Sequence, residues 1–213
     1  MKRIILPAVF IIILVAVSSC KREGDLPLCH FQEMVTASGG KLISDEGVTY
    51  KVLNMEKETG DGRWYIKGFA MREKGDDVLE VKLSSMKQAL SKNVLKLSES
   101  SEEELGNDPV NVENIWLSGS YINMLNGHNY DSGKSGAIHK VNLVFDDARS
   151  GPDTLYFSLR HNAAGDKGDT YTSYYTSFPF KEYIPSGKTG CVVTVEWKWD
   201  ADHTVSAPYG IKD

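Results

Sequence analysis

LGNDPVNVENIWLSGSY, residues 105–121, is the stretch that decides how this chain divides. It opens with Gly106-Asn107-Asp108-Pro109, in which each residue favours a turn for its own reason. Before it stands SESSEEE, residues 98–104, which has no apolar side chain to bury and therefore predicts a solvated connection. We expect a linker over residues 98–109, between a first β domain at 30–97 and a second one at 110–213.

The second domain shows the clearer strand pattern. Residues 115–124 predict either a strand pair or one bulged strand with Gly119 at the bulge. Apolar and polar side chains then alternate in residues 137–145, 154–161 and 191–199. Residues 174–180 predict a further strand, which Pro179 marks as an edge or a strand end. Long polar turns separate these segments, and there is neither a long amphipathic helix nor an internal repeat. This pattern is typical of an antiparallel β-sandwich with one solvated face on each sheet.

The sequence of the first domain predicts a small barrel. Its expected strands are residues 42–44, 48–53, 63–71, 79–83 and 94–97, with one or two helical turns at 84–90. Gly47 ends an acidic hairpin turn, and Gly68 predicts a bulge within its strand. Five short strands and a brief helix fit a Greek-key barrel of the OB type. The expected fold class is therefore all-β, an OB-like N-terminal barrel followed by an antiparallel β-sandwich.

The N-terminus has the pattern of an export signal. Lys2 and Arg3 precede an apolar run at residues 4–17, which is too short to span a bilayer of about 30 Å. The run ends in Val17-Ser18-Ser19-Cys20, which resembles a bacterial lipobox. That resemblance implies a lipoprotein signal peptide at 1–19, lipid on Cys20 and an anchored tether at 20–29. The alternative is an ordinary secretory signal with an incidental cysteine.

Charge and cysteine content limit the function further. Loss of Lys2 and Arg3 with the signal takes the formal net charge from −5 to −7, which disfavours nucleic acid as a partner. Nothing in the sequence indicates a cofactor. Cys29 and Cys191 remain after lipidation of Cys20, and export permits a disulfide between them. Two separate thiols are the favoured alternative, because sequence gives no Cα separation.

Two segments carry a family resemblance. GNDPVNVENIWLSGSYIN at residues 106–123 and LYFSLRHNAAGD at 155–166 resemble the NigD-like lipoproteins of Bacteroidetes. The resemblance implies an OB-like domain followed by a β-sandwich in the cell envelope. The family is linked by name to a bacteriocin gene cluster, and the resemblance brings no catalytic residues. The segment after Cys20 opens with Lys21-Arg22 rather than with acidic residues, which favours the periplasmic face of the outer membrane over the cell surface.

Enzyme chemistry finds little support in the sequence. A hydrolase would use His161 as base with Asp166 as its orienter, but a Gly-x-Ser-x-Gly elbow is absent from the sequence. The favoured interpretation makes His161 a structural residue and the protein not an enzyme. No metal site is predicted, because the histidines show no short spacing typical of metal ligands. They are His30, His128, His139, His161 and His203.

Tyrosines and carboxylates give the most suggestive cluster. Tyr171, Tyr174 and Tyr175 lie near Asp166 and Asp169, and sugars stack on aromatic rings while carboxylates accept their hydroxyls. The plainer interpretation is an edge strand whose tyrosines cover the sandwich. The leading hypothesis is thus a non-enzymatic outer-membrane lipoprotein that binds an envelope protein or another envelope component. A glycan-binding lipoprotein is the first alternative and a hydrolase around His161 the second.

Overall fold

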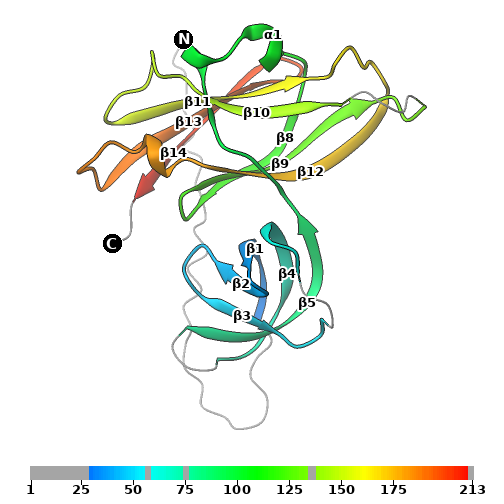
Figure 1. The fold of residues 1–213 in the computed structure, drawn as a ribbon, viewed down its shortest axis with the longest axis vertical. Coiled ribbons are helices and arrows are strands. Elements are labelled where there is room, and N and C mark those ends of the chain that lie inside the picture. Colours follow the sequence, from blue (N-terminus) through cyan, green and yellow to red (C-terminus); the bar gives the residue numbers. More distant parts are fainter. Residues whose placement is uncertain (1–28, 56–58, 74–76, 134–137, 211–213) are drawn as a thin grey trace, which may run out of the picture.

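The structure, a computed structural model, describes residues 29–55, 59–73, 77–133 and 138–210 (Figure 1). Two β bodies are stacked along the long axis, with the N-terminal barrel below the C-terminal sandwich in Figure 1. The all-β fold class and the order of barrel and sandwich are confirmed. The signal peptide, Cys20 and nearly all of the tether fall outside the described residues.

The barrel is closed by five strands. They are β1 (Cys29–Ser38), β2 (Lys41–Ser44), β3 (Thr49–Val52), β4 (Gly62–Glu73) and β5 (Val78–Gln88). The order around the barrel is β1-β2-β3-β5-β4, with β3 and β5 parallel and the other pairs antiparallel. This is the predicted OB-like arrangement. Its interior is filled by Val35, Ala37, Leu42, Tyr50, Ile66 and Val81.

The bulge predicted at Gly68 is present. Pairing of β4 with β5 shifts register between Lys67 and Gly68. A Cβ on Gly68 would lie 2.4 Å from the carbonyl oxygen of Lys82, so only glycine lets the strands approach this closely. The helical turns expected at residues 84–90 are wrong. β5 continues there as a strand because Met86 pairs with Ile66, and tertiary pairing overrides the local serine signal.

Two sheets form the sandwich. Their strands are β6 (Leu90–Ser91), β7 (Leu95–Lys96), β8 (Asn111–Ser118), β9 (Tyr121–Tyr130), β10 (Lys140–Phe145), β11 (Thr154–Asn162), β12 (Thr170–Pro179), β13 (Gly190–Lys198) and β14 (Asp202–Gly210). One sheet has the order β14-β13-β11-β10-β7 and the other β6-β12-β9-β8. The sandwich is not purely antiparallel, because β11/β13, β10/β7 and β12/β6 pair in parallel.

The segment joining the two bodies differs from the prediction. Residues 94–97 were expected as the last barrel strand, but β7 pairs with β10 of the sandwich. β1 supplies the fifth barrel strand instead. The expected solvated linker is partly folded, with a 3-10 turn at Leu97–Glu99 and the short helix α1 at Glu102–Leu105. Leu105 is only 1% exposed, so this segment is held against the sandwich.

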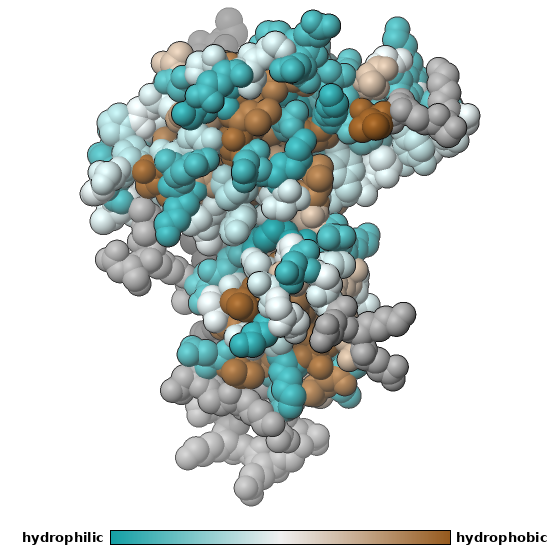
Figure 2. Space-filling view, viewed as in Figure 1, coloured by the Kyte–Doolittle hydropathy of each residue, from teal (hydrophilic) through white to brown (hydrophobic). Residues whose placement is uncertain are grey.

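Apolar side chains at alternate positions of the sandwich strands point inward and form the core. On β11, Leu155, Phe157 and Leu159 point inward, and from β9 Ile122 and Met124 meet them. Figure 2 shows apolar residues exposed in patches between larger polar areas of both bodies. A second 3-10 turn, Lys181–Tyr183, follows β12. Within the described residues, no helix is long and apolar enough to cross a membrane.

A buried ion pair of the barrel lies where the barrel meets the sandwich. The Arg63 guanidinium of β4 donates to both carboxylate oxygens of Asp45, at 2.5 and 2.8 Å, and both side chains are under 10% exposed. Arg63 also donates to the Ser177 hydroxyl of β12 at 3.1 Å. Asp45 accepts a further hydrogen bond from Ser118 at 2.5 Å. Buried charges need such partners, and the hydrogen bonds to Ser177 and Ser118 fix the barrel against the sandwich.

The turn between β8 and β9 completes that contact. Gly119 adopts a φ of +52°, and a Cβ there would lie 2.9 Å from the Cβ of Asp45. The strand-pair alternative for residues 115–124 is therefore correct, with Gly119 in the turn rather than at a bulge. Its missing side chain lets the hairpin reach Asp45.

Candidate functional site

A cleft of about 330 Å³ lies where the barrel meets the four-stranded sheet. This volume is at the lower end for a small-molecule site. Both bodies contribute to its walls, so the cleft is formed only when the barrel is docked on the sandwich. Its lining residues are Gln32, Glu33, Tyr65 and Lys67 from the barrel, and Asn114, Trp116, Leu125 and Tyr175 from the sandwich.

Three aromatic rings form one side of this cleft. Tyr65 and Tyr175 stack with centroids 4.1 Å apart and planes 18° from parallel. Trp116 meets both rings edge-on, with centroids 6.1 and 6.5 Å away. Burial, followed by the neighbouring Tyr175, raises the pKa of Tyr65 to about 12, so its hydroxyl keeps its proton. Rigid aromatic surface beside amide, ammonium and carboxylate groups is typical of binding sites.

Glu33 is the acidic group of the cleft. The Tyr50 hydroxyl inside the barrel donates a hydrogen bond to its Oε1. Burial raises the pKa of Glu33, the Tyr50 hydrogen bond opposes this, and nearby Asp45 and Glu46 add to the rise. The wall of the cleft is thereby coupled to the barrel core through Tyr50.

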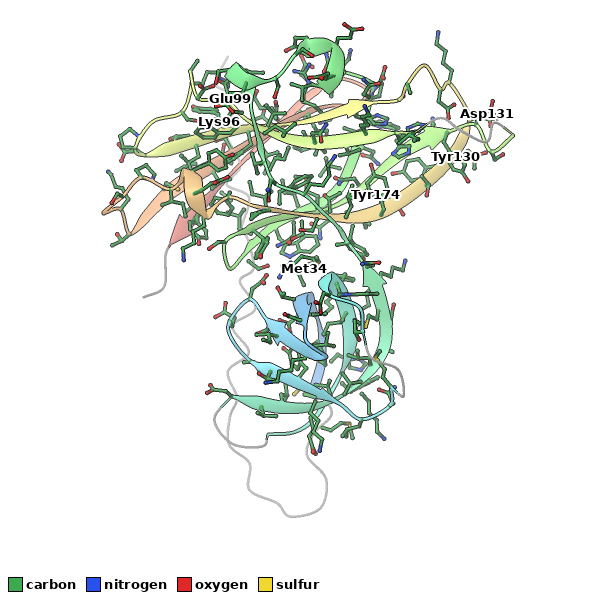
Figure 3. All side chains as sticks on the ribbon, viewed as in Figure 1. Met34, Lys96, Glu99, Tyr130, Asp131 and Tyr174 are labelled. Carbon is green, nitrogen blue, oxygen red and sulfur yellow. The ribbon has the colours of Figure 1, made fainter. Side chains whose placement is uncertain are left out.

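The predicted tyrosine platform is not assembled. Tyr171 is 44% exposed, and its hydroxyl donates to Glu113 at 2.6 Å. Tyr174, labelled in Figure 3, packs against the sandwich core. Tyr175 lines the cleft. Because adjacent residues of a strand point to opposite faces, Tyr174 and Tyr175 cannot share a surface. Asp169 is exposed in the loop before β12.

Asp166 is used inside the fold rather than on a platform. Its carboxylate accepts hydrogen bonds from the backbone N–H of Asp131 at 3.0 Å and of Gly168 at 2.9 Å. His139 Nε2 lies 3.1 Å from it. These contacts, the Asp131 N–H first, lower the pKa of Asp166 to about 2. The carboxylate thus ties the loop before β12 to the end of β9.

The geometry gives the hydrolase hypothesis no support at His161. His161 is 2% exposed, and its Nδ1 lies 2.9 Å from the carbonyl oxygen of Pro109. Its Nε2 lies 2.9 Å from Nδ1 of His139. Both ring nitrogens are therefore occupied, and Asp166 contacts His139 instead of orienting His161. An imidazole held in this way has no free nitrogen with which to activate a nucleophile.

The two cysteines are free thiols. Cys29 is exposed at the start of β1 in the barrel, whereas Cys191 is buried in the sandwich core. Burial raises the pKa of the Cys191 thiol. The possible disulfide is therefore not formed, because the two residues belong to different β bodies.

Sequence reasoning missed most of the cleft. Tyr65 and Trp116 were assigned to strands without a site role, and no local spacing connects them with Tyr175. Their meeting depends on how the barrel docks on the sandwich. The alternation on β12 could have separated Tyr174 from Tyr175 before the structure was known.

The fold places this chain among two-body β proteins, with a cleft between the barrel and the sandwich. A family model, the NigD-like C-terminal beta sandwich domain, matches residues 93–208. The chain therefore belongs to the NigD-like family. No curated protein sequence matches this chain.

Solved structures share the fold over nearly the whole chain. A protein of unknown function from Bacteroides vulgatus matches with a TM-score of 0.68 and 16% identity, covering 87% of this chain and 92% of that one. A NigD-like immunity protein from Bacteroides caccae has a TM-score of 0.60 and 17% identity, with coverage of 85% and 97%. A candidate lipoprotein from Bacteroides fragilis has a TM-score of 0.57 and 15% identity, with coverage of 86% and 98%. At these identities the likeness concerns the fold.

Proposed function

We propose that this protein is a non-enzymatic, lipid-anchored binding module of the outer membrane, and that it holds an envelope partner in the cleft between barrel and sandwich. The observation that carries the proposal is the cleft itself, an aromatic and polar surface to which both bodies contribute. The hydrogen bonds of Arg63 to Ser177 and of Asp45 to Ser118 support it, because a fixed docking keeps both walls of the cleft in place. The domains of this proposal are the signal at 1–19, the tether at 20–29, the barrel and the sandwich.

The lipobox-like residues 17–20 and the name of the Bacteroides fragilis relative support the proposed anchor. Several acyl chains on one cysteine give an effectively permanent attachment. Mass spectrometry of the mature N-terminus should find acylated Cys20, and Cys20→Ser should release the protein from membranes. Protease treatment of intact cells tests the periplasmic face, since rapid digestion would place the protein on the cell surface instead.

Photo-crosslinking in cells tests the cleft. A photoreactive amino acid in place of Lys67 lies in the cleft, whereas one in place of the exposed Lys188 lies in a surface loop of the sandwich. We expect a discrete adduct from position 67, none from position 188, and loss of the first adduct with Trp116→Ala. Equal labelling at both positions, or no adduct at either, would contradict a partner in the cleft.

A glycan is the second candidate partner, favoured by the position of Tyr175 beside Tyr65 and Trp116. Glycan arrays should then give a signal that Tyr175→Ala abolishes. Tyr174→Phe is the matched control, because Tyr174 points into the sandwich and should leave the signal unchanged. An array without signal removes this candidate and leaves a protein partner.

A further inference from the structure

Three histidines meet inside one end of the sandwich, away from the cleft. His161 continues the inward row of Leu155, Phe157 and Leu159 on β11. His128 continues the inward row of β9 and therefore faces β11 from the opposite sheet. His139 precedes β10 and closes the gap between them. One potential ligand atom from each lies within 4.8 Å of the other two.

Each histidine has an outer partner that orients its ring. His161 Nδ1 lies 2.9 Å from the Pro109 carbonyl oxygen, to which it must donate. His139 Nε2 lies 3.1 Å from Asp166, and His128 Nδ1 lies 3.1 Å from the Tyr174 hydroxyl. Metal-binding histidines characteristically use one nitrogen for such a carbonyl, carboxylate or hydroxyl.

The second ring nitrogens meet inside the cluster, where a metal ion would take the place of the His139–His161 contact. They are Nε2 of His161, Nδ1 of His139 and Nε2 of His128. The first two lie 2.9 Å apart, which without a metal requires a shared proton. His161 Nδ1 then donates to Pro109 and His139 Nε2 donates to Asp166. A divalent cation can replace the shared proton and keep both outer hydrogen bonds.

We propose that His128, His139 and His161 bind a divalent transition-metal ion, with Zn²⁺ the best match and the fourth position open to water. Imidazole suits Zn²⁺, and three histidines with an open position form a recognised zinc geometry. Tetrahedral bonds of about 2.0–2.1 Å place two ligand nitrogens about 3.3 Å apart, so His139 and His161 need to separate only slightly.

His139 supplies the required adjustment. Its ring stacks on that of His128, with centroids 4.2 Å apart and planes 10° from parallel. A metal lies near the plane of each imidazole that binds it, so one of these two rings must turn. His139 lies just outside β10 and is not held by strand pairing, whereas His128 is fixed within β9.

Asn126 adds a second indication of an occupant. It stands two residues before His128 on the same face of β9 and is fully buried. Its amide nitrogen donates to Thr176 at 2.6 Å, but its side-chain oxygen has no hydrogen-bond partner among the described residues. Such a buried acceptor normally has water or an ion nearby. Water bound to the metal is one species that could satisfy it.

Metal titration of the purified full-length protein in detergent tests the site. After chelator treatment, we expect one Zn²⁺ per chain by competition with a chromophoric chelator, and a rise in Tm on Zn²⁺ addition. Co²⁺ should give the visible absorption bands of a tetrahedral nitrogen site. His161→Gln should lower Zn²⁺ affinity by roughly 100-fold or more, and Asp166→Asn by about 10–100-fold.

His203→Ala is the matched control, since His203 is exposed and paired with Asp200 outside the cluster. It should bind Zn²⁺ as the unmodified protein does. Absence of Co²⁺ bands and of Zn²⁺ uptake by the folded, unmodified protein would overturn the proposal without any variant. Uptake that His161→Gln leaves unchanged, or that His203→Ala removes, would overturn it as well. None of these outcomes bears on the partner proposed for the cleft.

Discussion

Tyr174 and Tyr175 are neighbours on β12, yet the two faces of its sheet give them opposite surroundings. On the inner face, Tyr174 contacts His128 among apolar core residues. On the outer face, Tyr175 stacks on Tyr65 of the barrel. Polar groups on the inner face are gathered at one end of the core, whereas those on the outer face hold a second body. The inner face of this sheet thus packs the sandwich core, and its outer face holds the barrel. Substitutions on the two faces should have different effects on stability.

Arg63→Ala should have the largest effect, and on the outer face. It leaves the Asp45 carboxylate buried without its ion-pair partner, so we expect a loss of about 3–5 kcal/mol in the free energy of unfolding. Urea denaturation measures this. Arg149→Ala is the control, because the Arg149–Glu196 pair is half-exposed and should contribute no more than about 1 kcal/mol. Equal losses in the free energy of unfolding for the two variants would show that the buried Arg63–Asp45 pair contributes no more than the half-exposed pair.

Gly106→Ala should disturb the opposite sheet, at the end of β11 that carries His161. Gly106 has a φ of +68°, and a Cβ there would lie 2.6 Å from the carbonyl oxygen of His161. We expect a loss of about 2 kcal/mol or more, from backbone strain and from displacement of β11. Gly165→Ala has a similar φ of +78° but open space around it, so it measures strain without the clash. The Gly106 variant should lose more stability than the Gly165 variant in thermal unfolding.

Paired hydroxyl deletions compare the faces directly. Tyr174→Phe removes the partner of His128 Nδ1, and we expect a loss of about 1 kcal/mol. Tyr175→Phe should change stability by less, because its ring is only half-buried beside the open cleft. Chemical denaturation of both proteins under identical conditions gives the difference. A larger loss for Tyr175→Phe would reverse the roles assigned to the two faces.

Glu33→Gln should have the smallest effect and a particular pH dependence. The pKa of Glu33 in the folded protein is raised above its ordinary value of 4.5, chiefly by burial. The folded state therefore binds this proton more tightly than the unfolded state, and stability from this group is lost as pH rises through the folded pKa. Gln keeps an acceptor for Tyr50, so the variant should be slightly more stable at pH 7. The gap should close towards pH 4 in denaturation curves, and a constant gap would contradict the assignment.

Much of the architecture was predictable from the sequence. Alternation in β11 and β13 predicts their inward rows, and Gly68 is where the bulge was expected. β1 and β14 were not recognised as strands, because the alternation in CHFQEMVTAS is irregular and that in DHTVSAPYG is interrupted by Pro208. The extended form of these two strands is imposed by pairing with β4 and β13.

The histidine cluster illustrates a different limit. His128, His139 and His161 show no short spacing, because their meeting requires two sheets to face each other. A partial signal was present, since His161 extends the row that begins at Leu155 and so belonged on the core face. A buried histidine in an apolar row needs a hydrogen-bond partner. Nothing in the sequence indicates that two more histidines lie beside it.

The chain crossing between the two sheets of the sandwich, directly after the barrel, has a mechanical consequence. β6 joins one sheet and β7 joins the other, so the chain from Leu90 to Lys96 passes from sheet to sheet. Tension between an anchored N-terminus and a partner held on the sandwich would load this crossing along the covalent chain. Each of its strands is only two residues long. The hydrogen bonds of Arg63 to Ser177 and of Asp45 to Ser118 link the two bodies and share this load, so their rupture would precede unravelling of the crossing.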